Sequence, residues 1–161
     1  MPAARPLPAL LLPWLCAAVL LAGGCSLLSS APDPEEAWVE QEIHDGPPRR
    51  DLLRACEWAV LRSEFPVSDR DEVAGRVTSG WDVNLAPYSK QGTRSRAVLE
   101  VVELSERNAY RVRARVEVQR NQEVHQTLEL AAADWEDDGF DMTRARIVLQ
   151  QVLVQVRRPQ P

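Results

Sequence analysis

Residues 110–119, with the sequence YRVRARVEVQ, alternate between two kinds of side chain more clearly than any other stretch of the chain. The even positions hold Tyr, Val, Ala, Val and Val, whereas the odd positions hold Arg, Arg, Arg, Glu and Gln. Successive side chains of a strand point to opposite faces of a sheet, so this period of two predicts a β-strand. We expect an antiparallel sheet with one face on a hydrophobic core and one charged face in solvent.

The residues on either side of this stretch predict three more strands of the same sheet. Residues 94–104 place Ala97, Leu99 and Val101 on one face, and the polar residues 105–108 join them to the first strand as a hairpin. Upstream, the odd positions of residues 73–85 are mostly apolar, which predicts another strand. Downstream, residues 124–130 predict a fourth strand at the edge of the sheet.

Two stretches with helical periodicity flank the predicted strands. Residues 48–63 bring Leu52, Cys56, Ala59, Val60 and Ser63 to one face, and Pro66 stops the helix. Residues 141–157 form a second amphipathic helix, with Pro159 after its end. Its apolar face consists of Ala145, Val148, Leu149, Val152, Leu153 and Val156. The order of elements predicts an α+β fold in which two helices pack on one face of a three- or four-stranded antiparallel sheet.

The N-terminal segment is apolar and ends in a cysteine: residues 10–25 read LLLPWLCAAVLLAGGC. The apolar residues 7–22 are fewer than the ~20 needed to span a bilayer. Small residues followed by Cys25 resemble the lipobox of bacterial lipoproteins, although Leu21 lies one position further from the cysteine than is usual in that family. The resemblance implies a diacylglyceryl thioether on Cys25, acylation of its new amine and removal of residues 1–24. Ser26, in place of an aspartate, implies an outer-membrane destination.

This signal divides the chain into a signal peptide (residues 1–24), a tether (25–47), one domain (48–158) and a tail (159–161). The tether is rich in Ser, Pro and acidic residues and can contain a short helix over residues 34–43. Loss of residues 1–24 leaves 18 basic and 24 acidic residues, a net charge of −6. That balance argues against a nucleic-acid-binding protein, which would need an excess of basic residues.

The charged face of the predicted sheet holds the first candidate site. Arg111, Arg113 and Arg115 project from it at two-residue spacing, and Arg96 lies on the neighbouring strand. Guanidinium groups recognise phosphates and carboxylates through paired hydrogen bonds, so these four residues predict a surface for an anion or a protein partner. The alternative is a solvated face balanced by Glu100 and Glu117 across the strands.

The acidic segment before the second helix is the other candidate. Asp134, Glu136 and Asp138 stand at positions one, three and five of a segment that resembles a calcium-binding EF-hand loop. The loop's position twelve, normally a glutamate, is Ala145 here. We therefore expect this acidic cluster to cap the second helix at its positive end, with a calcium site as the alternative.

No nucleophile, base and orienting group can be assembled from the sequence, so we expect a non-enzymatic protein without a cofactor. The element order is similar to the helix-grip domains of accessory lipoproteins of the outer-membrane β-barrel assembly machinery, and to the lipopolysaccharide-assembly lipoproteins. The resemblance implies a periplasmic module, held on the outer membrane by its lipid, that binds an envelope protein. The alternative is a carrier that holds a lipid, a cell-wall fragment or another apolar or anionic ligand between the second helix and the sheet, beside Trp81 and Trp135. The oligomeric state stays open.

Overall fold

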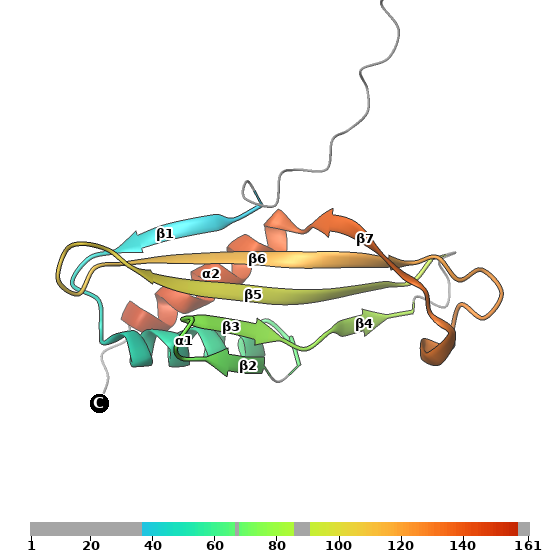
Figure 1. Ribbon diagram of the computed structural model, residues 1–161, viewed down its shortest axis with the longest axis horizontal. Coiled ribbons are helices and arrows are strands. Elements are labelled where there is room, and N and C mark those ends of the chain that lie inside the picture. Colours follow the sequence, from blue (N-terminus) through green and yellow to red (C-terminus); the bar gives the residue numbers. More distant parts are fainter. Residues whose placement is uncertain (1–36, 67, 86–90, 158–161) are drawn as a thin grey trace, which may run out of the picture. The chain divides into compact units, whose positions relative to one another are not determined.

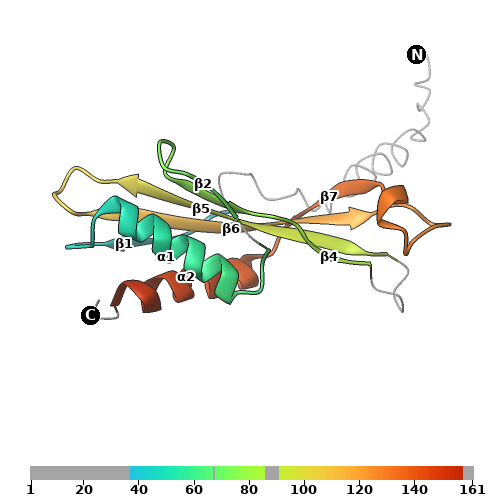
Figure 2. The ribbon, with the colours of Figure 1, turned by 90° about the horizontal axis from the view of Figure 1, so that it is seen from below.

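The computed structural model describes residues 37–66, 68–85 and 91–157. They form a seven-stranded antiparallel sheet with two helices on one of its faces (Figures 1 and 2). The elements in chain order are β1 (Val39–Ile43), α1 (Arg49–Arg62), β2 (Ser68–Asp71), β3 (Arg76–Ser79), β4 (Asp82–Asn84), β5 (Thr93–Glu103), β6 (Tyr110–Asn121), a 3₁₀ turn (Leu130–Ala132), β7 (Trp135–Phe140) and α2 (Met142–Arg157).

Strands β5 and β6 form the centre of the sheet as one long hairpin. Their register runs without interruption from Thr93 opposite Arg120 to Glu103 opposite Tyr110. Shorter strands line both sides of this hairpin: β1 and β7 follow one another along β6, and β3 and β4 follow one another along β5. The predicted hairpin is therefore confirmed, and the predicted α+β class is correct. The sheet is larger than the three or four strands expected.

The core lies between the sheet and the helix layer. Helices α1 and α2 contact each other and both cover the same face of the sheet (Figure 2). Leu52 and Cys56 of α1 and Val148 of α2 are fully buried against Leu99 and Val112 of the central hairpin. Burial raises the pKa of the Cys56 thiol to about 12, so this cysteine is an inert core residue. The apolar faces predicted for both helices are confirmed.

The single strand predicted over residues 73–85 is wrong. The chain instead makes two short strands, β2 and β3, joined by a tight turn, and then β4. Val73, placed on the apolar face by its odd number, is 93% exposed in that turn. An aspartate explains the turn, because the Asp71 side chain accepts hydrogen bonds from the backbone N–H groups of Val73 and Ala74.

Two further expectations need correction at the edge of β6. Residues 39–43 form strand β1 paired with Tyr110–Ala114, not the end of a helix over residues 34–43. The earlier residues of that predicted helix lie outside the described residues, as does Cys25. Residues 124–130 are not an edge strand; the acidic residues 135–140 take that place as β7. In both cases pairing with β6 outweighs local preference, because an edge of a long strand offers a row of backbone hydrogen bonds.

Gly75 provides a test of the β2–β3 turn. It has a φ of +72°, and a Cβ atom there would lie 2.8 Å from the carbonyl oxygen of Val101. We expect Gly75→Ala to lower the free energy of unfolding by about 2–3 kcal/mol, the sum of left-handed strain and a backbone clash. Gly139→Ala is the matched control, since its φ is +88° with no neighbour within 4 Å, and should cost only about 1 kcal/mol. Urea unfolding of both variants checks this; equal losses would contradict it.

Candidate functional site

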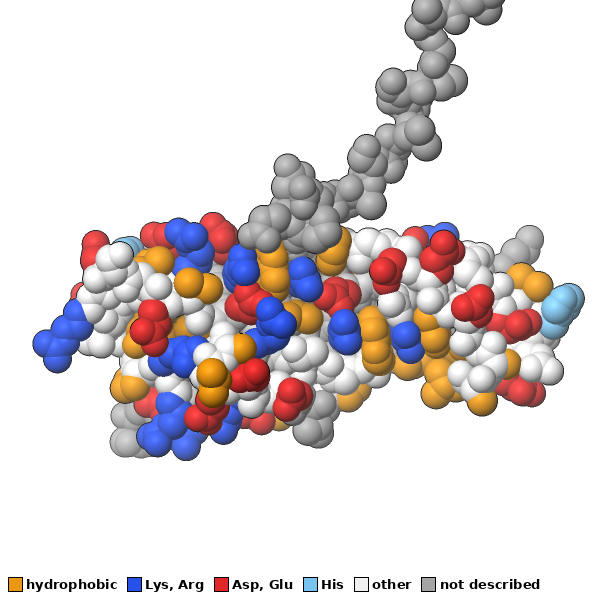
Figure 3. All heavy atoms as spheres, in the orientation of Figure 1, with side chains coloured by type: hydrophobic (Ala, Val, Ile, Leu, Met, Phe, Trp, Pro, Cys, Tyr) orange, Lys and Arg blue, Asp and Glu red, His pale blue; other side chains and the backbone are white. Residues whose placement is uncertain are grey.

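The arginines singled out from the sequence lie together on the sheet face that points away from the helices. Arg111, Arg113 and Arg115 of β6 alternate with the buried Val112 and Ala114, as predicted. Figure 3 looks onto this face and shows basic and acidic side chains intermixed over it. Each predicted residue therefore reaches the expected face, but with carboxylates beside it.

Glu100 is the centre of one charge cluster. Its carboxylate accepts hydrogen bonds from Arg76 on β3 and from Arg113 on β6, with N–O distances of 2.5 and 2.7 Å. Glu100 is buried although it lies on the open face, because these two side chains cover it. Burial alone would raise the pKa of Glu100, but the hydrogen bonds and charges of Arg113 and Arg76 outweigh burial and hold the pKa below its ordinary value.

Glu117 is the centre of a second cluster. Its carboxylate binds Arg96 across the hairpin at 2.6 Å and Arg115 of its own strand at 2.7 Å. Further along β6, Arg111 binds Glu42 of β1 at 2.8 Å. The hydrogen bond from Arg111 lowers the pKa of Glu42, and the same bond raises the pKa of Arg111. All four predicted arginines therefore have a carboxylate partner within the domain.

Tryptophan rings complete the packing of these side chains. The guanidinium groups of Arg94 and Arg96 lie 4.3 and 4.6 Å from the centre of the Trp81 ring, and Arg94 also lies 4.7 Å from Trp135. Such stacking is attractive through the ring quadrupole. Burial and the neighbouring charge of Arg96 lower the pKa of Arg94. Trp81 and Trp135 thus lie on the open face and do not line a pocket between α2 and the sheet.

Trp38, just before β1, packs in the same way over Arg113 and Arg115, at 4.5 Å from each. We call the whole surface the arginine–aromatic face. It consists of Trp38, Arg76, Trp81, Arg94, Arg96, Glu100, Arg111, Arg113, Arg115, Glu117 and Trp135. Because its guanidinium groups are already hydrogen-bonded and stacked, the face is a rigid surface rather than a set of free cations. Anion or partner binding by it stays a prediction.

The acidic segment has separate roles along its length. Glu136 accepts a hydrogen bond from Gln122, and Asp138 binds Arg120 at 2.6 Å across the β6–β7 pair. Asp134 follows the loop that precedes β7. Asp141 alone caps α2, since its carboxylate accepts the backbone N–H groups of Thr143 and Arg144. Among the described residues, no group of three or more His, Cys, Asp or Glu side chains is arranged to hold a metal ion.

The loop between β6 and β7, residues 122–134, was missed as a candidate because we expected a strand there. We call it the tip loop, since it lies at the end of the sheet beyond the helices (Figure 1). Val124, Leu128 and Leu130 expose 68%, 57% and 57% of their surface on it. Exposed aliphatic side chains are common singly, but three within seven residues make this loop a candidate docking surface.

Hydrogen bonds hold the tip loop in shape. The buried Asn121 side chain ties its two ends together, because Oδ1 accepts the backbone N–H groups of Glu123 and Asp134, each at 3.0 Å. The Glu123 carboxylate accepts the N–H groups of His125 and Gln126, and these bonds lower its pKa. The loop therefore keeps its aliphatic side chains in solvent by a defined structure.

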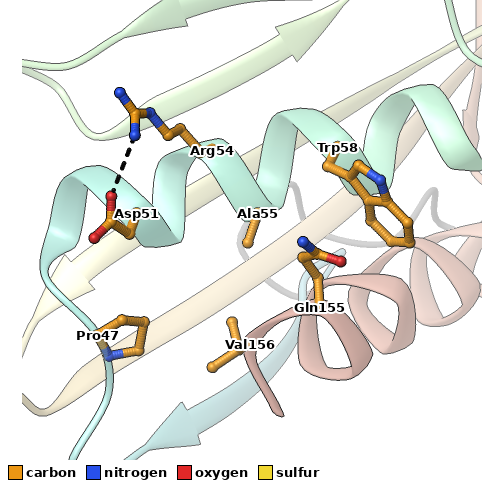
Figure 4. A pocket seen from close by; sticks show the side chains of 7 residues that line it. All are labelled: Pro47, Asp51, Arg54, Ala55, Trp58, Gln155 and Val156. Atoms are coloured by element: carbon orange, nitrogen blue, oxygen red, sulfur yellow. Dashed lines mark ion pairs between the residues drawn. The ribbon is translucent and has the colours of Figure 1, made fainter. Parts of the chain in front are cut away.

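The helix layer carries two hollows along the seam between α1 and α2. One, of about 320 Å³, lies where α1 begins and α2 ends, with Ala55 and Trp58 facing Gln155 and Val156 (Figure 4). The other, of about 230 Å³, lies at the opposite end of the seam, beside Ile147. The first is at the lower limit of the about 300–1,000 Å³ that ligand pockets usually enclose, and the second is below it.

Comparison with known proteins adds no assignment: no protein-family model matches the chain, and no curated protein matches it in sequence. Neither helix of the described part of the chain is long and apolar enough to cross a membrane.

Proposed function

We propose that this protein is an outer-membrane-anchored periplasmic lipoprotein that acts as a non-enzymatic accessory module and binds a protein partner in the envelope. The observation that carries the proposal is the tip loop. The buried Asn121 and the backbone hydrogen bonds hold this loop in one structure that leaves Val124, Leu128 and Leu130 exposed. We infer that these side chains contact the partner.

The negative charge around the tip loop favours a protein over a lipid bilayer as its binding partner. Residues 121–143 contain seven acidic residues and no lysine or arginine. Anionic phospholipids would repel such a segment, whereas basic segments are the ones they attract. A protein groove with apolar walls and a basic rim would accept both the aliphatic side chains and the carboxylates.

The carrier alternative draws no support from the space between α2 and the sheet. Val148 and Val152 of α2 pack there against the buried residues of β5 and β6. Trp81 and Trp135, which the carrier alternative would place in a ligand pocket, stack on Arg94 on the opposite face of the sheet. A filled core suits a module that works through its surface.

The predicted anchor would act as a recruitment device. Twelve residues lie between Cys25 and Trp38, so the chain between them can extend at most about 45 Å. A domain confined to that distance from the bilayer meets membrane proteins at a high effective concentration. Even a small tip-loop contact could then recruit an envelope protein.

Site-specific cross-linking in intact cells tests the proposal. A photoreactive residue at Leu128 is expected to give a covalent adduct with one envelope protein. Combining it with Val124→Ser and Leu130→Ser should reduce the adduct by about tenfold or more, since each lost aliphatic contact is worth roughly 1.5–3 kcal/mol. The matched control is a photoreactive residue at Arg107, in the exposed β5–β6 turn at the other end of β6. The same adducts from both positions, or none from Leu128, would contradict the proposal.

A further inference from the structure

The outward face of α2 differs from an ordinary solvent-exposed helix face. The ten residues from Ile147 to Val156 read IVLQQVLVQV and contain no charge. Ile147, Gln150 and Val154 point outward, and the two aliphatic side chains expose 51% and 45% of their surface. The outer face of a helix on a soluble domain is normally charged, whereas the centre of a protein interface is depleted of charge.

We propose that this face of α2 is the contact between two copies of the chain, packed as an antiparallel helix pair about a two-fold axis. The chain carries a net charge of −5, so a face without acidic side chains is the one where repulsion between two copies is weakest. The outer face of α2 has no acidic side chain over the ten residues 147–156. This inference does not depend on the tip loop or on the lipid.

The sequence of the face is complementary to itself under a two-fold rotation. With the axis between Gln150 and Gln151, Ile147 of one copy lies opposite Val154 of the other at both ends of the contact. The two glutamines meet their own counterparts at the centre, where side-chain amides can hydrogen-bond to one another. A C2 contact requires this kind of pairing, in which residue i meets j and j meets i.

The two hollows of the α1–α2 seam fit the same arrangement. The larger hollow is lined by Gln155 and Val156, which follow Val154 in the chain, and the smaller hollow is lined by Ile147. Antiparallel pairing brings Ile147 of the second copy beside the larger hollow and Val154 of the second copy beside the smaller one. Each outward aliphatic side chain thereby meets a depression in the facing seam, as packing of ridges into grooves requires.

Disulfide trapping in intact cells tests the geometry. Gln150→Cys should form a disulfide-linked dimer under mild oxidant, since residue 150 lies beside its own counterpart. Ile147→Cys alone should not, because two copies of residue 147 would lie about 10 Å apart along the helix axis, beyond the ~7 Å limit between the Cα atoms of a disulfide. Ile147→Cys combined with Val154→Cys should again form the dimer. Cys56 is buried and cannot interfere.

Three controls keep the result unambiguous. The native chain under the same oxidant should give no disulfide-linked dimer, which excludes trapping through Cys25. Val154→Asp should lower the Gln150→Cys dimer by about tenfold, and Leu128→Asp on the tip loop should leave it unchanged. Circular dichroism confirms that each variant is folded. A dimer from Ile147→Cys alone, no dimer from a folded Gln150→Cys, or an adduct with a different protein would overturn the proposal, and none of these outcomes bears on the tip loop.

Discussion

Glu100→Gln is expected to lower the free energy of unfolding by about 3 kcal/mol at pH 7. The substitution removes one charge that two guanidinium groups share, and hydrogen bonds to charged groups are worth roughly 1.5–3 kcal/mol each. Arg76 and Arg113 would then face each other across a neutral amide, and both would lose the carboxylate that they share, which is buried between them. The neighbouring cluster around Glu117 would not compensate, because its carboxylate already binds Arg96 and Arg115.

The stabilisation by Glu100 should depend on pH, and its lowered pKa decides the direction of that dependence. The pKa of Glu100 is lower in the folded protein than in the unfolded chain, because the hydrogen bonds from Arg113 and Arg76 outweigh the effect of burial. A lowered carboxyl pKa contributes stability that is fully present above the unfolded pKa, about 4.3, and is lost as the pH falls through the folded pKa. The stability difference between the native protein and Glu100→Gln should therefore narrow below about pH 4.

Urea unfolding at pH 7 and at pH 3 measures both effects. The matched control is Glu103→Gln, at the exposed end of the same strand, where the carboxylate lies 3.6 Å from Arg49. An exposed ion pair is worth about 0.2–1 kcal/mol, so this control should change little at either pH. If both variants lost the same free energy of unfolding at pH 7, the buried ion pairs of Glu100 would contribute no more to stability than the exposed pair of Glu103.

The local sequence predicted those elements whose pattern and packing agree. Strand β6 alternates because one of its faces is buried, β5 buries Ala97, Leu99 and Val101 as expected, and both helices carry a continuous apolar face. Register also follows once the turn at residues 104–109 is placed, since it pairs Glu100 with Arg113 and Arg96 with Glu117. Two of the arginine–carboxylate pairs could therefore have been derived from the sequence.

The elements that pair with the outer edge of β6 could not be predicted in this way. Residues 39–43 follow the sequence DPEE at 33–36, which suits a helix start, and residues 135–140 are acidic enough to suggest a loop. Both become strands because β6 is twelve residues long and offers its edge to β1 at one end and to β7 at the other. Such choices depend on which segments meet in three dimensions, and propensity is only a weak guide to them.

The candidate surfaces also divide into features that the local sequence predicts and features that depend on contacts between distant residues. Alternation placed the four arginines on the correct face, but the stacking of Trp38 and Trp81 on them joins residues far apart in the chain. The alternation of Leu128 and Leu130 with Glu129 predicts a strand where the structure has the tip loop. The absence of lysine and arginine from residues 121–143 was the available sign that this end of the protein differs from the rest.

Cys25→Ser is expected to remove the protein from the outer-membrane fraction, with a loss of about tenfold or more. Acyl chains add roughly 0.8 kcal/mol per buried CH₂ group, and stable anchoring needs more than one chain. In the described part of the chain no helix could replace that anchor by crossing the bilayer. The hydroxyl of serine cannot form the thioether, so neither acylation nor the associated removal of residues 1–24 should occur.

Membrane fractionation by density, followed by immunodetection, measures the loss, and Cys16→Ser provides the matched control because that cysteine lies inside the predicted signal peptide. The control should stay in the outer membrane. Mass spectrometry of the native N-terminal peptide gives an independent answer, since it should begin at residue 25 and carry the mass of the acyl chains. A native protein that retains Met1, or that carries an unmodified thiol at Cys25, would remove the basis for recruitment by a tether. It would leave the α2 contact and the stability of the Glu100 cluster as they are, because both depend only on residues 37–157.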